Sequence, residues 1–249
     1  MSSVAAAQTE KKKFGISASG LKYIVIFAML CDHIAYLFLP SESMLYGVMR
    51  CFGRTTAPVM CFFISEGFHY THNLKKYFLR LGVFAFISHF AFRYAFGKGI
   101  FSIGVESFIA TLFFSLLSVY IYNTEKVKTA FKFPLIILML FFADFCDWGA
   151  DAVLFTLAFE LARGKRENQL IAYGSVAIIR RLFPLFRIAV KTPDAMQYEW
   201  YKFGVLIPIV LIMLYNGEKG GSKHTKWVFY IFYPAHLFVL GYIHRKYFQ

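Results

Sequence analysis

The chain has 249 residues, of which 58% are hydrophobic and only 16% are charged. Soluble domains contain about 45–50% apolar and about 25% charged residues, and their surface cannot expose so large an apolar excess. Nine membrane spans of about 20 residues would occupy roughly 180 positions and leave only loops and tails. The composition therefore predicts an all-α, polytopic membrane helix bundle. It excludes a separate soluble domain, a Rossmann unit and a zinc module.

The net charge is +13, from 27 Lys and Arg against 14 Asp and Glu. In a soluble chain this excess would indicate nucleic acid, but in a membrane protein basic residues gather in cytoplasmic loops. We therefore expect no nucleic-acid partner. The four cysteines form no C-x-x-C pair and lie mostly in apolar runs. This is typical of free packing residues and not of a disulfide framework or a metal site.

The apolar runs predict about nine membrane-spanning helices, with eight to ten as the range. Residues 1–20 are expected to form a disordered cytoplasmic tail, and residues 21–249 a single transmembrane domain. Several runs are shorter than the ~20 residues of a full crossing, so some helices should be broken or re-entrant. In chain order, the predicted spans are about 21–39, 56–68, 76–96, 100–122, 133–146, 148–161, 170–190, 203–215 and 227–243.

The distribution of basic residues predicts the orientation of these spans. With a cytoplasmic N-terminus, fourteen Lys and Arg lie in cytoplasmic segments and seven, including Arg50 and Arg54, lie on the opposite side. This asymmetry agrees with the positive-inside rule. The span 170–190 carries three arginines and a proline, but its removal would place the basic segment 216–226 outside the cell. We therefore retain it.

Ionisable residues within the first span are functional candidates, because a charge at the bilayer centre costs at least ~2.5–3.5 kcal/mol. Lys22 and His33 are eleven residues apart, so three helical turns place them on one face about 16 Å from each other. Asp32 is rotated by ~100° and must meet a partner on another helix or orient His33 through water. Two alternatives remain: Lys22 is a snorkelling anchor, or Asp32 and His33 only hold helices together.

A second polar cluster lies in and after the second predicted span. Arg54 opens this span, and Glu66, His69 and His72 follow at its far end at intervals of one turn. The i, i+3 spacing could place metal ligands on one face. However, Gly67 loosens the helix and no further ligand is evident, so we expect no metal.

The basic residues that follow favour another use of this cluster. With Lys75 and Lys76 beside them, the histidines fit a site for a substrate phosphate or a lipid headgroup. The alternative is structural, in which Glu66 pairs with Arg80 or with Arg54.

Three acidic residues surround the turn between the fifth and sixth predicted spans. Asp144, Asp147 and Asp151 would form one stripe on a continuous helix, but Gly149 favours a break. Because this turn is expected on the non-cytoplasmic side, the favoured interpretation is that they are solvated loop acids.

Arginines inside the seventh predicted span have two possible uses. Arg180, Arg181 and Arg187 could bind a polyanionic cofactor through forked hydrogen bonds. They could instead pair between helices with acids such as Glu66 or Glu106. The sequence leaves both open.

The segments LKYIVIFAMLCDHIAY and GRTTAPVMCFFISEGFHYTHNLKKYFLRL together resemble the F-pilin acetylase family (TraX). The similarity covers about residues 16–243. Each element is weak alone, but their order within these spans is specific. One departure is Ser107, where family members tend to have Asn. The matching elements are Leu21-Lys22, Asp32-His33, Gly53-Arg54 with Pro58, Glu66-Gly67, Thr71 and Asn73, Tyr77, Arg80-Leu81, Asp144 with Gly149, and Tyr233-Pro234-Ala235-His236.

This family is similar to the broader transmembrane acyltransferases, which use acyl-CoA and a first-span basic residue followed eleven positions later by His. Lys22 and His33 fit that spacing, with Lys where Arg is usual. The resemblance implies a multi-pass protein of the bacterial inner membrane, in contact with membrane lipid. It also implies acetyl transfer from acetyl-CoA to an amine or hydroxyl acceptor. The acceptor could be the N-terminus of a pilin-like protein, a glycan, a small amine or another envelope component.

Residues and resemblance together assign expected roles. His33 is the expected general base, since its ordinary pKa of about 6.5 is close to the working pH. Asp32 would fix its tautomer or act through another helix, and Arg54 would stabilise the oxyanion. Lys22 would hold the phosphate or pantetheine of acetyl-CoA, helped by Arg80, Lys75 or Lys76. The predicted acceptor-binding residues are Glu66, His69, Tyr77 and His236.

Two other classes remain open. The same intramembrane charges could form the path of an ion- or proton-coupled transporter. The sequence shows no inverted repeat, and nine spans do not divide into equal halves. A non-catalytic scaffold for envelope assembly is the third class, and it would tolerate neutral replacements at Lys22, His33 and Arg54.

Overall fold

The computed structural model describes residues 14–97, 107–222 and 225–248. The first helix begins at Ala18, inside the range predicted as tail, and Ser17 caps it by accepting a hydrogen bond from the Gly20 N–H. Ahead of it, an isolated bridge joins Ile16 to Tyr215. Residues 1–13 of the predicted tail and the candidate Glu106 lie outside the described residues.

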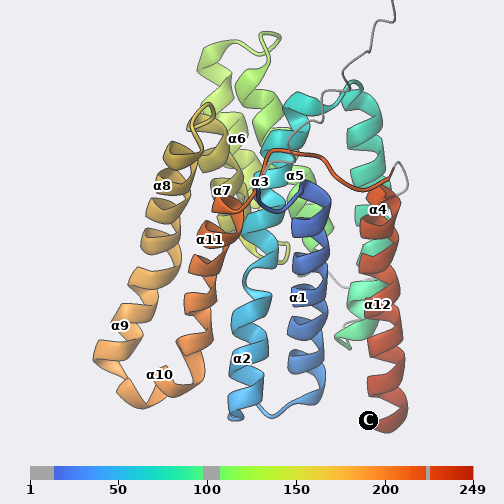
Figure 1. Ribbon diagram of the computed structural model, residues 1–249, viewed down its shortest axis with the longest axis vertical. Coiled ribbons are helices and arrows are strands. Elements are labelled where there is room, and N and C mark those ends of the chain that lie inside the picture. The colour runs from blue at the N-terminus through green and yellow to red at the C-terminus, as the bar shows by residue number, and fades with distance from the viewer. Residues whose placement is uncertain (1–13, 98–106, 223–224, 249) are drawn as a thin grey trace, which may run out of the picture.

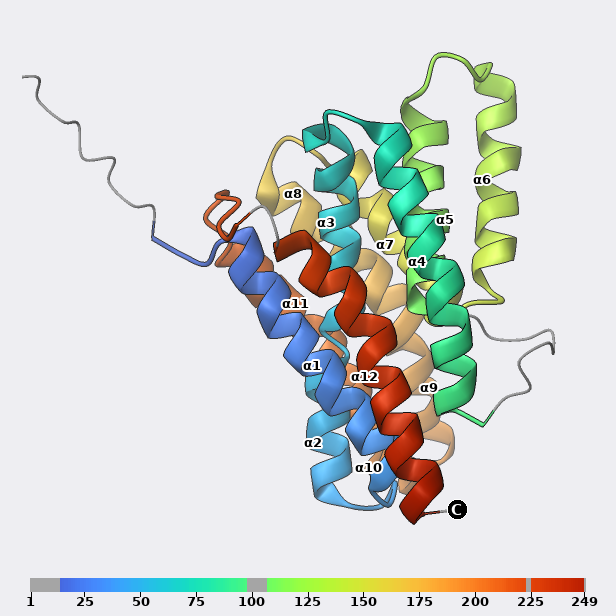
Figure 2. The same cartoon turned by 90° about the vertical axis from the view of Figure 1, so that its right-hand side faces the viewer.

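The described residues fold into a bundle of helices that run roughly along one long axis, as Figures 1 and 2 show. The predicted fold class, an all-α membrane helix bundle, is confirmed. The elements are α1 (Ala18–Phe38), α2 (Met44–Gly53), α3 (Thr56–Tyr70), α4 (Leu74–Ala95), α5 (Phe108–Asn123), α6 (Thr129–Ala143), α7 (Gly149–Leu161), α8 (Arg166–Ala177), the π-helical η1 (Ile178–Leu182), α9 (Phe183–Lys191), α10 (Pro193–Glu199), the 3-10 helix η2 (Trp200–Leu206), α11 (Ile207–Met213) and α12 (Thr225–Tyr247).

Each predicted span overlaps at least one of these helices, and their lengths differ widely. Three continuous helical stretches are long and apolar enough to cross a membrane, by length and composition: Ala18–Phe38, Arg166–Lys191 and Trp227–Tyr247. α5 and α6 are apolar but shorter. Large apolar side chains are exposed over the outer surface, among them Phe86, Phe133 and Phe186. In an integral membrane protein such side chains face lipid.

The second predicted span, 56–68, corresponds to α3, and the unpredicted helix α2 precedes it to form one broken helix. α2 starts at the end of the bundle where α1 finishes, and α3 continues to the opposite end (Figure 1). The sequence predicted no helix over residues 44–53; this was wrong, because Ser43 caps a helix there by accepting from the Tyr46 N–H. At the break, a Cβ on Gly53 would lie 2.3 Å from the side chain of Asp32. Glycine therefore permits the close approach of α1 to the broken helix.

The turn between α6 and α7 bends back into the protein. Its Trp148 has a φ of 68°, which is unusual for a bulky residue, and Gly149 has a φ of 56°. Asp144 caps α7 by accepting from the Ala150 N–H. The prediction of solvated loop acids holds for exposed Asp144 only: Asp151 is 7% exposed, and Asp147 lines an internal cavity. The sequence reasoning missed this fold-back because partners distant in sequence create it.

Candidate functional site

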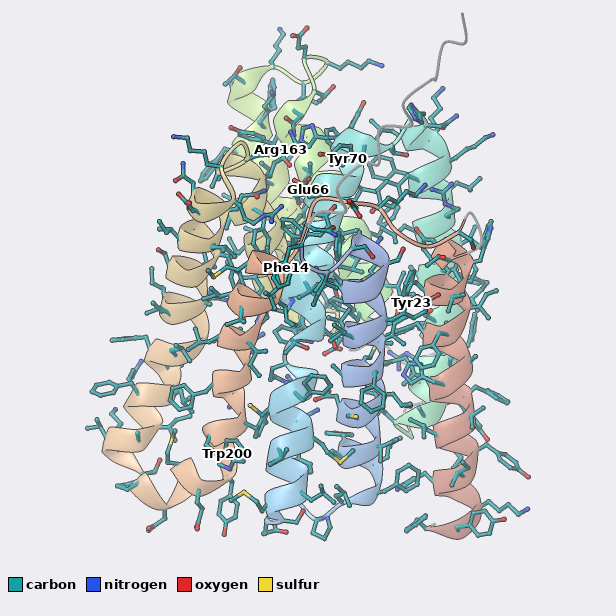
Figure 3. The ribbon with its side chains drawn as sticks, in the orientation of Figure 1. Phe14, Tyr23, Glu66, Tyr70, Arg163 and Trp200 are labelled. Carbon is teal, nitrogen blue, oxygen red and sulfur yellow. The ribbon has the colours of Figure 1, made fainter. Side chains whose placement is uncertain are left out.

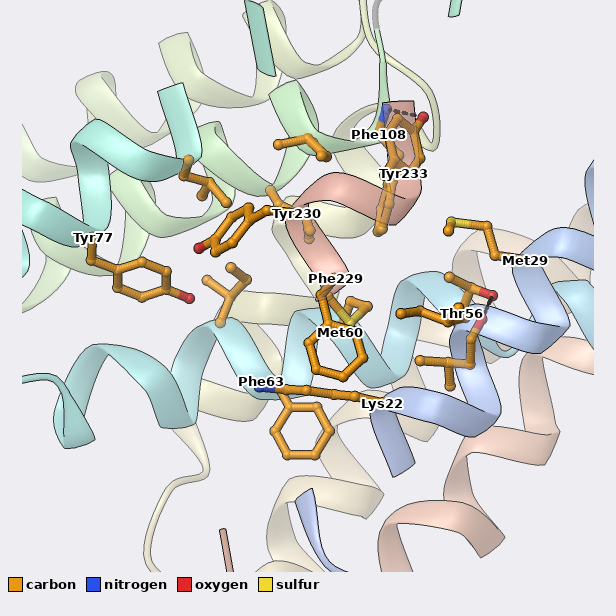
Figure 4. Close-up of a pocket in the computed structure, with 16 residues that line it drawn as sticks. Lys22, Met29, Thr56, Met60, Phe63, Tyr77, Phe108, Phe229, Tyr230 and Tyr233 are labelled. Atoms are coloured by element: carbon orange, nitrogen blue, oxygen red, sulfur yellow. Dashed lines mark hydrogen bonds between the residues drawn. The ribbon is translucent and has the colours of Figure 1, made fainter. Parts of the chain in front are cut away.

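A large, partly open chamber lies between α1, α3, α4, α5 and α12, with about 770 Å³ of space that includes solvent at its opening. Figure 4 shows its walls, which are mainly aliphatic and aromatic. The side chains that bring polar atoms to these walls are Lys22, Thr56, Tyr77, Tyr230 and Tyr233. Such a chamber suits a long, mostly apolar ligand that carries a few polar groups.

Lys22 is the charged side chain in this chamber wall. Its Nζ lies 4.8 Å from the ring centroid of Phe63 and 5.7 Å from that of Phe229. No carboxylate pairs with it among residues 14–97, 107–222 and 225–248, and Lys219 adds a second positive charge nearby. Aromatic faces attract the ammonium but leave its N–H donors unused. The arrangement favours an anionic ligand over a simple end-anchor.

A small chamber of about 270 Å³ adjoins the large one. Both are lined by Met29, Thr56, Phe108 and Tyr233, so they meet at these four side chains. Lys22 lines the large chamber and His33 the small one. α1 thus presents the two residues to adjoining cavities that share these four wall residues, Met29 among them.

His33 pairs with a second histidine instead of with Asp32. Its Nδ1 lies 2.8 Å from Nε2 of His236, whose own Nδ1 lies 2.8 Å from the Phe232 carbonyl oxygen. His33 is 7% exposed and His236 6%. His236, predicted to bind the acceptor, is therefore the hydrogen-bond partner of the candidate base. Asp32 makes none of the recorded hydrogen bonds to His33.

Asp32 meets partners on another helix, as its rotation predicted. Arg50 Nη1 donates to its carboxylate at 2.8 Å, and Arg54 Nη2 donates to both carboxylate oxygens at 3.0 Å. The three side chains are only 12–18% exposed. Arg50 thus lies on α2 and Arg54 at its C-terminal end, so the segment predicted as a loop between the first two spans is partly helical. An arginine within the short apolar segment MLYGVMRCFG was the available signal for a buried pair.

Trp148 links this ion pair to a second one. The guanidinium carbons of Arg54 and Arg181 each lie 5.0 Å from its ring centroid. Arg181 also pairs with Asp151 at 2.5 Å, and Arg180 pairs with it at 2.7 Å. Pairing between helices was one of the two interpretations left open for these arginines, but the acid is Asp151. Both arginines belong to η1, and π-helical turns of this kind often occur at functional sites.

Two predicted acceptor-binding residues, Glu66 and His69, line neither chamber. Glu66 Oε1 lies 3.4 Å from Nε of Arg163, and Figure 3 labels both side chains, so the pairings with Arg80 or Arg54 were wrong. His69 Nε2 contacts Glu160 at 2.7 Å. Glu160 also accepts hydrogen bonds from Ser65 and Asn123. Sequence reasoning missed Glu160, although a carboxylate near the end of the apolar segment 148–161 was a signal for a buried polar contact.

The remaining candidates lie on α4, which forms one wall of the large chamber. Tyr77 lines the chamber, and the Arg80 guanidinium lies 5.9 Å from its ring and also against the Tyr230 hydroxyl. Lys75 and Lys76 are exposed on the first turn of α4. Within the described parts of the chain, no three His, Cys, Asp or Glu side chains are grouped as a metal site would require.

Comparison with known proteins gives two matches. A family model described as TraX protein matches residues 17–244. A curated relative, "Probable fimbrial assembly protein FimC, serogroup H1" from Dichelobacter nodosus, is 34% identical over 237 residues, which cover 92% of this chain and 96% of the relative. No solved structure matches.

Proposed function

This chain belongs to the TraX protein family, and from that premise we propose that it is a membrane-embedded acetyltransferase. It would transfer the acetyl group of acetyl-CoA to an amine or hydroxyl acceptor. The single observation that carries this proposal is a pair of adjoining cavities on one face of α1. Among the described residues, the ammonium that lines one cavity has no carboxylate partner, and a buried imidazole lines the other.

The large chamber fits the donor in chemistry and in length. Lys22 sits at its charged end, where its free N–H donors would hold a phosphate or the carbonyl groups of pantetheine. Three helical turns separate it from His33, about 16 Å, and the aromatic and aliphatic walls between them suit the pantetheine arm. Tyr77 and Arg80 would narrow the mouth on the α4 side. Acetyl-CoA would supply a thioester, which is the electrophile.

The chain's own residues perform the proton transfer. His33 would take a proton from the acceptor as the new bond to the acetyl carbon forms, and would return it to the thiolate as the C–S bond breaks. The burial of His33 excludes water that would compete with the acceptor. Arg54 stays a proposed contributor to oxyanion stabilisation through the positive charge it brings near the small chamber, although Asp32 already holds its Nη2.

Two further features of the proposal concern orientation and acceptor. A cytoplasmic N-terminus in a bacterial inner membrane would place the Lys22 end on the side where acetyl-CoA is made. The relative's name refers to fimbrial assembly, which favours a pilin-like protein as acceptor. Acids deep in the bundle, Asp147 and Asp32, line the small chamber and would face an incoming amine.

The test uses purified protein in detergent, labelled acetyl-CoA, and either a pilin-like protein or an envelope extract as acceptor. We expect labelled product with the unaltered chain and a loss of about 10²–10⁴-fold in kcat with His33→Ala. The exposed His72 offers the matched control, since it lines neither chamber, and His72→Ala should retain activity. A folded His33→Ala protein that acetylates normally would refute the proposal. Solute-coupled flux in liposomes without acetyl transfer would support the transporter instead.

A further inference from the structure

The hydrogen bonds of the buried pair His33 and His236 determine which ring nitrogens carry protons. The Phe232 carbonyl oxygen can only accept, so Nδ1 of His236 must carry the hydrogen of that 2.8 Å contact. A neutral imidazole has one N–H, which leaves a lone pair on Nε2 of His236. This lone pair must accept the 2.8 Å hydrogen bond from Nδ1–H of His33. The one nitrogen left on His33 is then an unprotonated Nε2.

We propose that His236 is a positioning residue which, through the Phe232 carbonyl, fixes His33 in the tautomer whose Nε2 lone pair is available to the small chamber. This inference rests on the proposed function, because it matters only if His33 is the base. A base acts through its lone pair, so the opposite tautomer would present an N–H to the acceptor and could not take its proton.

The surroundings of the pair favour neutral rings before the reaction. Both histidines are at most 7% exposed, and burial of an unpaired charge is costly. Asp32 is the nearest acid on α1, but Arg50 and Arg54 already occupy its carboxylate. A charged pair would therefore have no unpaired acid on α1, and the other carboxylate of the small chamber, Asp147, accepts from the Trp148 N–H. In the neutral state, the order of donors from His33 to the carbonyl is the one that satisfies every contact.

The hydrogen bonds that run from His33 through His236 to the Phe232 carbonyl form a relay, and packing on α12 holds this relay in place. The His236 ring stacks on Phe232 with centroids 4.8 Å apart and an interplanar angle of 12°. His33 and His236 stack at 5.0 Å and 20°, and Tyr233 meets both rings edge-on. Pro234 has no N–H and removes one backbone hydrogen bond from this stretch of helix. These contacts fix the direction of the His236 lone pair.

The relay would also stabilise the positive charge that develops on the His33 ring during the reaction. As His33 accepts the acceptor's proton on Nε2, its Nδ1–H becomes a stronger donor to His236, and the carbonyl dipole beyond stabilises the positive ring. When the C–S bond breaks, the same proton passes from Nε2 to the thiolate, and the neutral pair is restored. No proton needs to leave His236 during the cycle.

The experiment compares two replacements of similar length, His236→Gln and His236→Met. The glutamine amide oxygen can accept from Nδ1–H of His33, whereas the methionine side chain offers at best a weak acceptor. We expect His236→Met to lower kcat by roughly 100-fold, within the range for a mispositioned general base, while KM for acetyl-CoA changes by about twofold or less. His236→Gln should recover kcat to within about tenfold of the unaltered protein.

Two outcomes would overturn the relay: a His236→Met protein with normal kcat, or Gln and Met variants that lose kcat equally while remaining folded. The double variant His33→Ala with His236→Met should lose no more activity than His33→Ala alone, because the relay acts only through His33. The failure of the proposed function looks different, since His33→Ala would then be active. An inactive His33→Ala together with an active His236→Met would reject the relay and leave the acetyltransferase in place.

Discussion

The two ends of the buried face of α1 differ in whether their charged side chain is paired with an opposite charge. Near the start of the helix, Lys22 projects a cation into a large chamber, where its ammonium lies over the rings of Phe63 and Phe229 and pairs with no carboxylate of the described residues. Near its end, Asp32 is saturated by two arginines, and one of these also stacks on Trp148. A buried charge that the protein compensates fully holds helices together, whereas one that it leaves unpaired is available to a ligand. We therefore propose that the Asp32 end holds helices together and that the Lys22 end binds a ligand.

The largest expected effect is at the compensated end. Asp32→Ala would leave Arg50 and Arg54 as unpaired charges inside the bundle, so we expect a loss of about 3–5 kcal/mol in the free energy of unfolding. Chemical unfolding in mixed micelles measures it. Replacing all three residues, by Asp32→Leu, Arg50→Met and Arg54→Met, should restore most of the stability without restoring activity. A stable Asp32→Ala protein would show that the ion pairs do not hold α1 to the broken helix.

The second prediction concerns the uncompensated end. Lys22→Met removes a cation without a recorded carboxylate partner, so stability should be unchanged or slightly higher. KM for acetyl-CoA should rise roughly tenfold, equivalent to ~1.4 kcal/mol of lost binding, with little change in kcat. The exposed Lys126 provides the control, and Lys126→Met should leave KM unchanged. If Lys22→Met destabilises the protein and leaves KM unchanged, Lys22 is a structural anchor.

How far the sequence predicted this contrast depends on the range of the interactions involved. Apolar runs are a local property, and they located α1, α4 and α12 within about four residues and the C-terminal end of α5 within one residue. The rotation of Asp32 away from His33 is also local, so its need for a partner on another helix was predictable. The identity of that partner was not predictable. Arg50 lies on the short helix α2, and its guanidinium can be buried there because Asp32 pairs with it. The fold-back at Trp148 was not predicted either, because its contacts with Arg54 and Arg181 join residues that are distant in sequence.

In the candidate site, too, the features that depend on local spacing were predicted, and those that depend on contacts between distant residues were not. The spacing of Lys22 and His33 predicted one face, and the two adjoining chambers that these residues line agree with that placement. The role of His236 depends on a contact between residues separated by 203 positions, which no helical spacing encodes. Glu66 and His69 have suitable chemistry and spacing for an acceptor site. The fold gives them partners on α7 and beyond it instead, away from both chambers.

The smallest expected effect tests this last assignment. Glu66→Gln breaks one ion pair whose arginine is 33% exposed, so the loss in stability should be at most about 1 kcal/mol. Because Glu66 lines neither chamber, kcat and the KM values for acetyl-CoA and acceptor should stay within about twofold of those of the unaltered protein. Steady-state kinetics with a pilin-like acceptor measures this. A more than tenfold loss in kcat/KM for the acceptor alone would return Glu66 to the acceptor site that its sequence position suggested, and would extend binding to a part of the bundle beyond both chambers.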